Sequence, residues 1–248
     1  MVEPWLIGGL LTAVLLLPVA IAPVRLLTRA GLVHAWGLGT LVWGSLGWPG
    51  FAIVAFYFLA GSALTRLGMA RKQAAGLAER RAGARGPENV WGSALTGAAC
   101  ALATLAAPAP QSALFVLGYA ASFSTKLADT TASEVGKAYG RRTFSPATLR
   151  PVPPGTEGAV SWEGTLAGAV ASAVLALVAW ATGAIAAVGV GWCVAAALVA
   201  TTLESAIGAT LQQRWAWLTN EAVNVAHTAI GAAMAMALAG LAGGGSAS

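Results

Sequence analysis

Lysine and arginine are confined to every second gap between the apolar runs of this 248-residue chain. A membrane-spanning helix needs about 20 mostly apolar residues. The sequence holds about eight such runs, roughly Trp5–Val24, Gly31–Gly47, Phe51–Leu67, Val90–Ala107, Ser112–Leu127, Gly164–Thr182, Ala184–Leu203 and Val223–Leu241. All 14 basic residues lie in or at the edges of the gaps after the first, third, fifth and seventh runs. This pattern predicts an all-α, polytopic transmembrane bundle of about seven or eight helices.

The same charges predict the orientation of the bundle. Cytoplasmic loops carry an excess of lysine and arginine, so we expect all basic loops in the cytoplasm and both termini outside. The first run has no basic residue before it and follows Glu3, so we interpret it as a spanning helix and not as a cleaved signal. We expect one catalytic membrane domain at 1–242, a flexible tail at 243–248, and a polar site that faces the cytoplasm from a bacterial or archaeal inner membrane.

Composition excludes a soluble protein, because only 9% of the residues are charged and 57% are hydrophobic, whereas soluble domains carry about 25% charged residues. The net charge of +5 favours anionic lipid or a phosphorylated substrate over nucleic acid. Cys100 and Cys193 lie in apolar runs and are interpreted as packing residues. His34 and His227 have no cysteine or carboxylate at metal-binding spacing, so we interpret them as packing or interfacial residues.

The segment from Lys126 to Lys137 concentrates polar groups that a membrane protein otherwise avoids. It contains Asp129, which is the chain's single aspartate, together with Glu134, three hydroxyl side chains and two lysines. Placing such groups at a membrane is costly unless they are paired or functional. We therefore predict that this segment forms the floor of an active site at a membrane face.

If this segment continues the preceding helix, Lys126, Thr130, Glu134 and Lys137 form one stripe, and Asp129, Ser133 and Lys137 form an adjacent one. Asp129 and Glu134 then point partly apart and could hold different groups. Mg²⁺ prefers oxygen ligands and is commonly shared with substrate phosphates, so we predict both carboxylates as Mg²⁺ ligands. The alternative is a helix end that holds only ion pairs, such as Glu134 with Lys137.

Two loops carry candidate phosphate-binding groups. In Arg150–Thr165, backbone N–H groups at Gly155, Thr156, Glu157 and Gly158 could approach an anion, and Ser161 could cap the next helix. An ordinary capped loop is the alternative. Arg80, Arg81 and Arg85 precede the fourth run, and guanidinium groups bind phosphate in a bidentate way. Positive-inside topology alone would also explain these arginines.

A late segment adds polar residues to the seventh and eighth runs. Glu204 ends an apolar run and is therefore expected to point into the bundle. Gln212 follows at helical spacing from Glu204, and we expect both to complete the pocket. Asn224 is a candidate either for substrate contact or for a hydrogen bond between helices.

Three motifs carry a family resemblance. They are Asp129-Thr-Thr-Ala-Ser-Glu-Val-Gly136, Val152-Pro-Pro-Gly-Thr-Glu-Gly158, and Ser205-Ala-Ile-Gly-Ala-Thr-Leu-Gln212 with Asn224. In this order, the sequence resembles the membrane family of phytyl-phosphate and polyprenyl-phosphate kinases. It departs from the family at Asn89 and Ser93, where Gln and Asn are usual, and at Glu204, where Asp is usual.

The resemblance implies a Mg²⁺-dependent kinase that transfers a phosphoryl group from a nucleoside triphosphate, with CTP expected, to a phytyl, geranylgeranyl or farnesyl monophosphate. Asp129, Glu134 and Lys126 are then the expected catalytic residues, and Asp129, Glu134 and Glu204 the metal ligands. The residues expected to bind lipid phosphate or nucleotide are Arg85, Asn89, Thr130, Ser133, Lys137, Arg150, Gly155, Thr156, Glu157, Gly158, Gln212 and Asn224. An oligomer is compatible with this reading.

Other classes stay open on the residues alone. A transporter of a lipid phosphate or cation could use Asp129 and Glu204 as ion ligands near broken helices. A structural membrane subunit is a further possibility. A CDP-alcohol phosphotransferase is excluded, because its repeated aspartate motif cannot occur in a chain with one aspartate.

Overall fold

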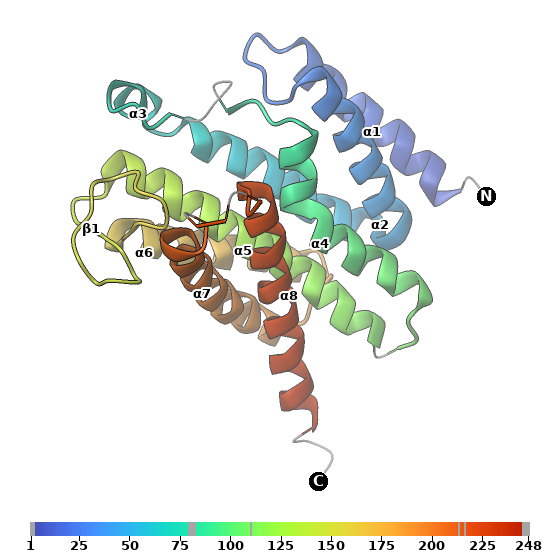
Figure 1. Ribbon diagram of the computed structural model, residues 1–248. Coiled ribbons are helices and arrows are strands. Elements are labelled where there is room, and N and C mark those ends of the chain that lie inside the picture. The colour runs from blue at the N-terminus through green and yellow to red at the C-terminus, as the bar shows by residue number, and fades with distance from the viewer. Residues whose placement is uncertain (1–2, 79–82, 110, 213, 216, 245–248) are drawn as a thin grey trace.

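The computed structural model describes residues 3–78, 83–109, 111–212, 214–215 and 217–244 (Figure 1). Arg80, Arg81 and residues 245–248 of the predicted tail lie outside this range. The elements in chain order are α1 Pro4–Ile21, α2 Arg29–Arg66, α3 Met69–Ala74, α4 Pro87–Ala106, α5 Gln111–Tyr139, β1 Thr143–Phe144, β2 Val160–Ser161, α6 Trp162–Ala181, α7 Ala187–Thr210 and α8 Asn220–Gly244. The all-α prediction is confirmed.

The element α2 consists of two helices joined at Gly47. This glycine has φ 64° and ψ −155°, which is not a helical conformation. The rings of Trp43 and Phe51 lie 5.6 Å apart across the joint. At the other end, Arg66 Nη2 donates a hydrogen bond to the carbonyl of Arg25 at 3.2 Å. The chain therefore reverses at Gly47, and the two halves correspond to the second and third apolar runs.

The remaining predicted runs also form helices. Among the described residues, α1, α2, α6, α7 and α8 are long and apolar enough to cross a membrane. The helices α4 and α5 pack among them. Because α2 supplies two of the runs, all eight predicted runs are helical.

The basic loops meet at one end of the bundle. Thr28 N–H donates to the Arg85 carbonyl at 3.0 Å, which joins the loops before α2 and before α4. The Arg71 guanidinium lies 5.0 Å from the centre of the Tyr139 ring, at the end of α5. The loops that carry the basic residues in the sequence therefore lie at the same end of the bundle. Assignment of this end to the cytoplasm follows from the positive-inside rule and stays a prediction.

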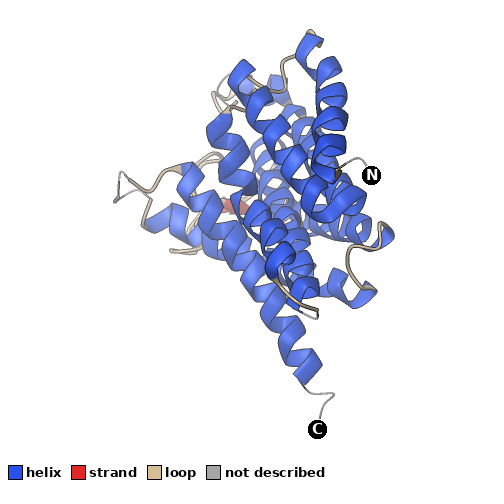
Figure 2. Ribbon diagram, turned by 90° about the vertical axis from the view of Figure 1, so that its right-hand side faces the viewer, coloured by secondary structure: helices blue, strands red, loops and turns tan. Residues whose placement is uncertain are grey.

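Helix α5 is the centre of the bundle and packs against α2, α4, α6, α7 and α8 (Figure 1). Helices make up almost all of the structure, and the strand pair is a small part of it (Figure 2). Every residue from Leu117 to Asp129 is buried. A Cβ atom on Gly164 would lie 2.5 Å from the Ala132 carbonyl oxygen, and one on Gly168 would lie 2.8 Å from that of Ala128. The α6 backbone thus lies directly against α5, as small residues permit in membrane bundles.

The polar segment continues α5, as predicted, and the helix extends to Tyr139. Beyond it, β1 and β2 pair antiparallel, with Thr143 opposite Ser161. Ser161 caps α6 by accepting a hydrogen bond from Gly164 N–H at 3.1 Å, which confirms the predicted cap. The strand pair and the cap hold the 145–159 loop beside the charged end of α5.

Candidate functional site

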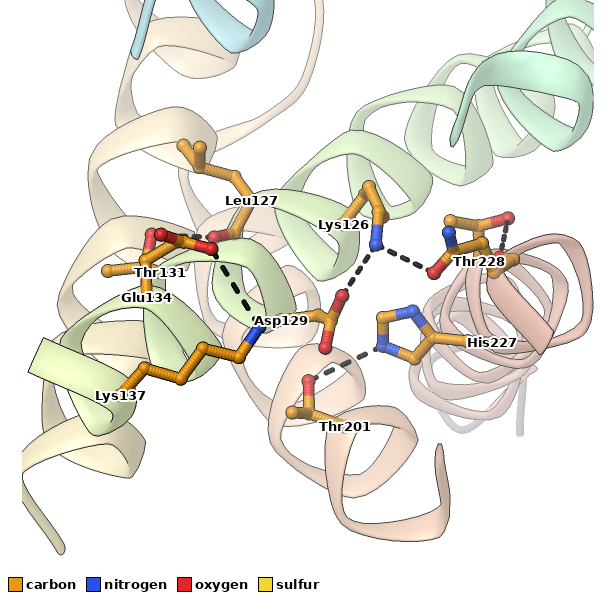
Figure 3. A network of polar contacts seen from close by, with 10 residues as sticks. Lys126, Leu127, Asp129, Thr131, Glu134, Lys137, Thr201, His227 and Thr228 are labelled. Carbon is orange, nitrogen blue, oxygen red and sulfur yellow. Dashed lines mark hydrogen bonds and ion pairs between the residues drawn. The ribbon is translucent and has the colours of Figure 1, made fainter. Parts of the chain in front are cut away.

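Lys126 connects α5 to α8 at the centre of the site. Its Nζ donates to Asp129 Oδ2 at 2.5 Å and to Asn224 Oδ1 at 2.7 Å (Figure 3). Both charged side chains are about nine-tenths buried. Burial of this pair is costly unless hydrogen bonds compensate, and the Asn224 amide oxygen supplies one of them. Three residues predicted for the site are therefore brought into direct contact.

A polar cavity of about 870 Å³ opens beside Lys126. Its lining includes seven residues that the sequence predicts for the site: Arg85, Asn89, Lys126, Thr130, Lys137, Gln212 and Asn224. Within the described residues, Gln212 Oε1 is buried there without a hydrogen-bond partner. The lining holds three cationic side chains and the carboxylates of Glu88 and Glu221, so cationic groups outnumber anionic ones and could bind an anion.

Asp129 reaches a second, smaller cavity on the other side of α5. This cavity has a volume of about 250 Å³, lies between α5, α6 and α7, and is lined by Asp129 and Ser133 among others. Lys126 lines the polar cavity and bonds Asp129. The ion pair therefore lies between the two spaces.

The surroundings of Asp129 contain His227 and Glu204. His227 is 1% exposed, and its imidazole faces the Asp129 carboxylate (Figure 3). His227 Nε2 lies 3.4 Å from Thr201 Oγ1. The charges of Glu204 and Asp129 also interact. The expectation that Glu204 points into the bundle agrees with this position.

Glu134 belongs to a separate ion pair. Its Oε2 makes a very close contact with Lys72 Nζ of α3, which also donates to the Thr65 carbonyl at 2.7 Å. Lys137 Nζ lies 4.0 Å from Glu134 Oε1. Among the described residues, no group of three or more His, Cys, Asp or Glu is placed to hold a metal ion. The role of Glu134 as a ligand stays a prediction, and its observed contacts join α3 to α5.

The predicted phosphate loop lies outside the polar cavity's lining. Arg150 and Thr156 are exposed, and Thr156 Oγ1 donates to the Pro153 carbonyl at 2.8 Å. Gly155 packs against Leu77. Gly158 packs against the backbone of α7. Glu157 interacts electrostatically with Glu204, and Pro146, Ala159 and Val160 line the smaller cavity together with Asp129.

We expect Gly158→Ala to lower the free energy of unfolding by about 2–4 kcal/mol, since the change adds both backbone strain and a clash. Gly158 has φ 71°, and a Cβ atom there would lie 2.3 Å from the Ser205 carbonyl oxygen. Gly76 is the matched control, because it has φ 70° but open space around its Cβ position. Gly76→Ala should cost only about 1–2 kcal/mol. Equal losses in detergent-solubilised unfolding would contradict close packing at Gly158.

Sequence patterns did not identify three residues of the site. Lys72 sits in a basic loop, so topology already accounted for its charge. His227 has no polar partner near it in the sequence. Tyr57 lines the polar cavity, and its ring lies 5.4 Å below the Arg85 guanidinium. In an apolar run, an aromatic residue gives no signal that distinguishes a site from a helix contact.

Comparison with known proteins agrees with the motifs. The family model of the integral membrane protein DUF92 matches residues 12–232. The chain is 57% identical over 235 residues to the "Uncharacterized membrane protein sll0875" of Synechocystis sp., covering 95% of this chain and 91% of that protein. It is 44% identical over 214 residues to "Protein VTE6, chloroplastic" of Arabidopsis thaliana, covering 85% of this chain and 64% of that protein.

No solved structure matches the chain. The family match spans most of the sequence, including the three motifs up to Asn224. The resemblance drawn from those motifs is thereby confirmed at the level of the family. The chain belongs to the integral membrane protein family DUF92.

Proposed function

We propose that this protein is a polyprenyl-phosphate kinase, which transfers the terminal phosphoryl group of a nucleoside triphosphate, with CTP as the expected donor, to an isoprenoid monophosphate. The observation that carries the proposal is the polar cavity of about 870 Å³ lined by Arg85, Lys126 and Lys137. Two anionic phosphate groups must approach each other in this reaction. Cationic side chains on several walls of one cavity would offset their repulsion.

Catalysis of this reaction depends on alignment of the two phosphate groups more than on proton transfer. An oxygen of the lipid phosphate attacks the terminal phosphorus of the donor, a new P–O–P linkage forms, and the bond to the nucleoside diphosphate breaks. The attacking oxygen is already anionic, so no general base is required. Arg85 would hold one phosphate in a bidentate way, and Lys126 and Lys137 would neutralise charge on the other.

We infer that Asp129 would hold a Mg²⁺ ion shared with substrate phosphates, with Glu204 as the second carboxylate. Asp129 and Glu204 are two carboxylates whose charges interact within the bundle, and Mg²⁺ commonly takes one or two carboxylates plus phosphate oxygens. When bound, Mg²⁺ would neutralise phosphate charge. Glu134, paired with Lys72, would support the position of α5 beneath the cavity.

The two substrates would reach the site by different routes. The polar cavity lies at the end of the bundle where the basic loops meet, and its lining includes residues at the start of α8, such as Asn220. A water-soluble nucleotide would enter there. The family resemblance of the Asp129–Gly136 motif implies the isoprenoid acceptor and the phosphoryl transfer.

A transporter of a lipid phosphate or cation is the second candidate. The buried Lys126–Asp129 pair favours it, because intramembrane charges mark ion pathways as well as catalytic sites. The two functions differ in whether a covalent bond changes. Chemical analysis of the lipid therefore separates them.

The test uses purified protein in lipid nanodiscs with Mg²⁺, geranylgeranyl monophosphate and each of the four nucleoside triphosphates in turn. We expect prenyl diphosphate by mass spectrometry, formed in equal amount to the nucleoside diphosphate, with the highest rate for CTP. Arg85→Gln should reduce the rate about 100-fold, whereas Arg142→Gln, an exposed arginine outside the polar cavity's lining, should leave it unchanged. Unmodified monophosphate together with its flux across liposomes would overturn the kinase and support transport.

A further inference from the structure

An apolar cavity adjoins the polar one. It has a volume of about 220 Å³ and lies between α1, both halves of α2 and α4, with Phe123 of α5. Its walls are mainly aliphatic and aromatic, for example Leu16, Leu38 and Phe58. Such a space suits a hydrocarbon chain and offers little to a charged group.

The two cavities share a boundary of four residues, namely Tyr57, Arg85, Asn89 and Ser93. Arg85 is fixed there by its backbone, since its N–H donates to the Leu26 carbonyl at 3.0 Å and its own carbonyl accepts from Thr28. Its guanidinium lies 5.4 Å and 5.8 Å from the centres of the Tyr57 and Phe58 rings. A cationic group therefore stands between a polar and an apolar space.

The apolar cavity has a deep end and a side that faces lipid. At the deep end, a Cβ atom on Gly39 would lie 2.6 Å from the Thr12 side chain and 3.2 Å from the Phe51 ring. Leu15 and Leu59 line the cavity but are 48% and 59% exposed. The cavity therefore borders the exposed outer surface of α1 and of the second half of α2.

We propose that this apolar cavity binds the head-proximal part of the prenyl chain of a lipid monophosphate, whose phosphate contacts Arg85 at the boundary. This inference rests on the proposed function for the acceptor, and it adds where the chain lies. The charge of Arg85 complements the phosphate, and the continuity of the two cavities places the chain next to it. The lipid enters sideways past Leu15 and Leu59, and its nucleotide partner enters from the polar side.

The first test is a binding measurement without nucleotide, so failure of kinase activity does not affect it. A geranylgeranyl monophosphate with a photoreactive diazirine on the second isoprene unit is irradiated with the wild-type protein. We expect the label in 12–19, 35–39 or 51–59. Label concentrated in α6 and α7, around the small cavity beside Ser133, would overturn the proposal.

Variants that narrow the cavity provide the second test. Ala55→Phe and Ala35→Phe alter two different walls, and both positions are half-buried. Each should weaken binding of the C20 monophosphate at least about tenfold while the C5 monophosphate changes less than about twofold, because binding of a longer chain depends on more buried carbon atoms. Ala99→Phe, on a lipid-exposed position of α4 outside the cavity's lining, is the control and should change neither.

A competing phospholipid tests whether the cavity prefers a prenyl chain to an ordinary acyl chain. Dioleoyl phosphatidic acid at equal concentration should not displace the C20 monophosphate; equal displacement would overturn preference for a prenyl chain.

Gly61→Ala should weaken binding of the C5 and C20 monophosphates by the same factor, because a Cβ atom there would lie 2.7 Å from Arg85 Nη2 and shift the guanidinium. Loss of the C20 ligand alone in Gly61→Ala would contradict the placement of the phosphate at Arg85.

Discussion

Asp129→Asn is expected to lower the rate of prenyl diphosphate formation by about 10³-fold. The substitution keeps the shape of the side chain but removes the negative charge that contacts Lys126 and interacts with His227. Without that charge, the Lys126 ammonium would lose its ion-pair partner, and the proposed Mg²⁺ ion would lose a ligand. Initial rates with geranylgeranyl monophosphate and CTP measure the effect.

The control for this prediction is a second acid-to-amide change. Glu163→Gln alters a half-buried carboxylate at the start of α6, whose Oε1 accepts from Arg141 N–H at 3.4 Å. It lies outside the lining of the polar cavity, so its rate should match the wild type. An Asp129→Asn protein that folds normally and keeps more than about half of the wild-type rate would remove Asp129 from the reaction.

Lys72→Met is expected to produce the largest loss of stability, about 3–5 kcal/mol, since it leaves the Glu134 carboxylate buried without its closest cation. Glu134→Met should lower the stability by a similar amount, because it leaves the Lys72 ammonium buried without its carboxylate partner. The double variant should recover most of the loss, because two apolar side chains of similar size replace a buried ion pair. Unfolding in mixed detergent micelles measures all three variants.

The same cycle decides what Glu134 does. If Glu134 is a metal ligand, as the sequence predicts, the Lys72→Met/Glu134→Met double variant should fold but lose turnover. If the carboxylate only joins α3 to α5, the double variant should keep turnover per folded molecule. Additive losses of stability in the double variant would contradict the ion pair itself.

The bundle could be predicted from the sequence because bilayer physics acts on long segments. A run such as Trp5–Val24 must cross or pack in apolar surroundings, and basic residues such as Arg66 stay at one side. The turn at Gly47 follows from a short gap between two runs. These predictions can be made without knowing which helices are in contact.

Contacts between helices were less predictable. Lys126, Asp129 and Asn224 were each identified by polarity in an apolar context, and the fold brings them together. Glu134 and Lys72 are 62 positions apart in the sequence, and no local spacing indicates that pairing. The anion-binding role predicted for Gly155 and Gly158 stays a prediction, and the structure shows that both glycines also pack closely, against Leu77 and against the backbone of α7.

The most direct test of the proposed function is transfer of ³²P from the γ position of CTP to phytyl or geranylgeranyl monophosphate by the purified wild-type protein with Mg²⁺. The proposal predicts label in the terminal phosphate of an extractable prenyl diphosphate, and its absence from the Asp129→Asn reaction. Label that stays in nucleotide or free phosphate, with every donor tested and with folded protein, would contradict it.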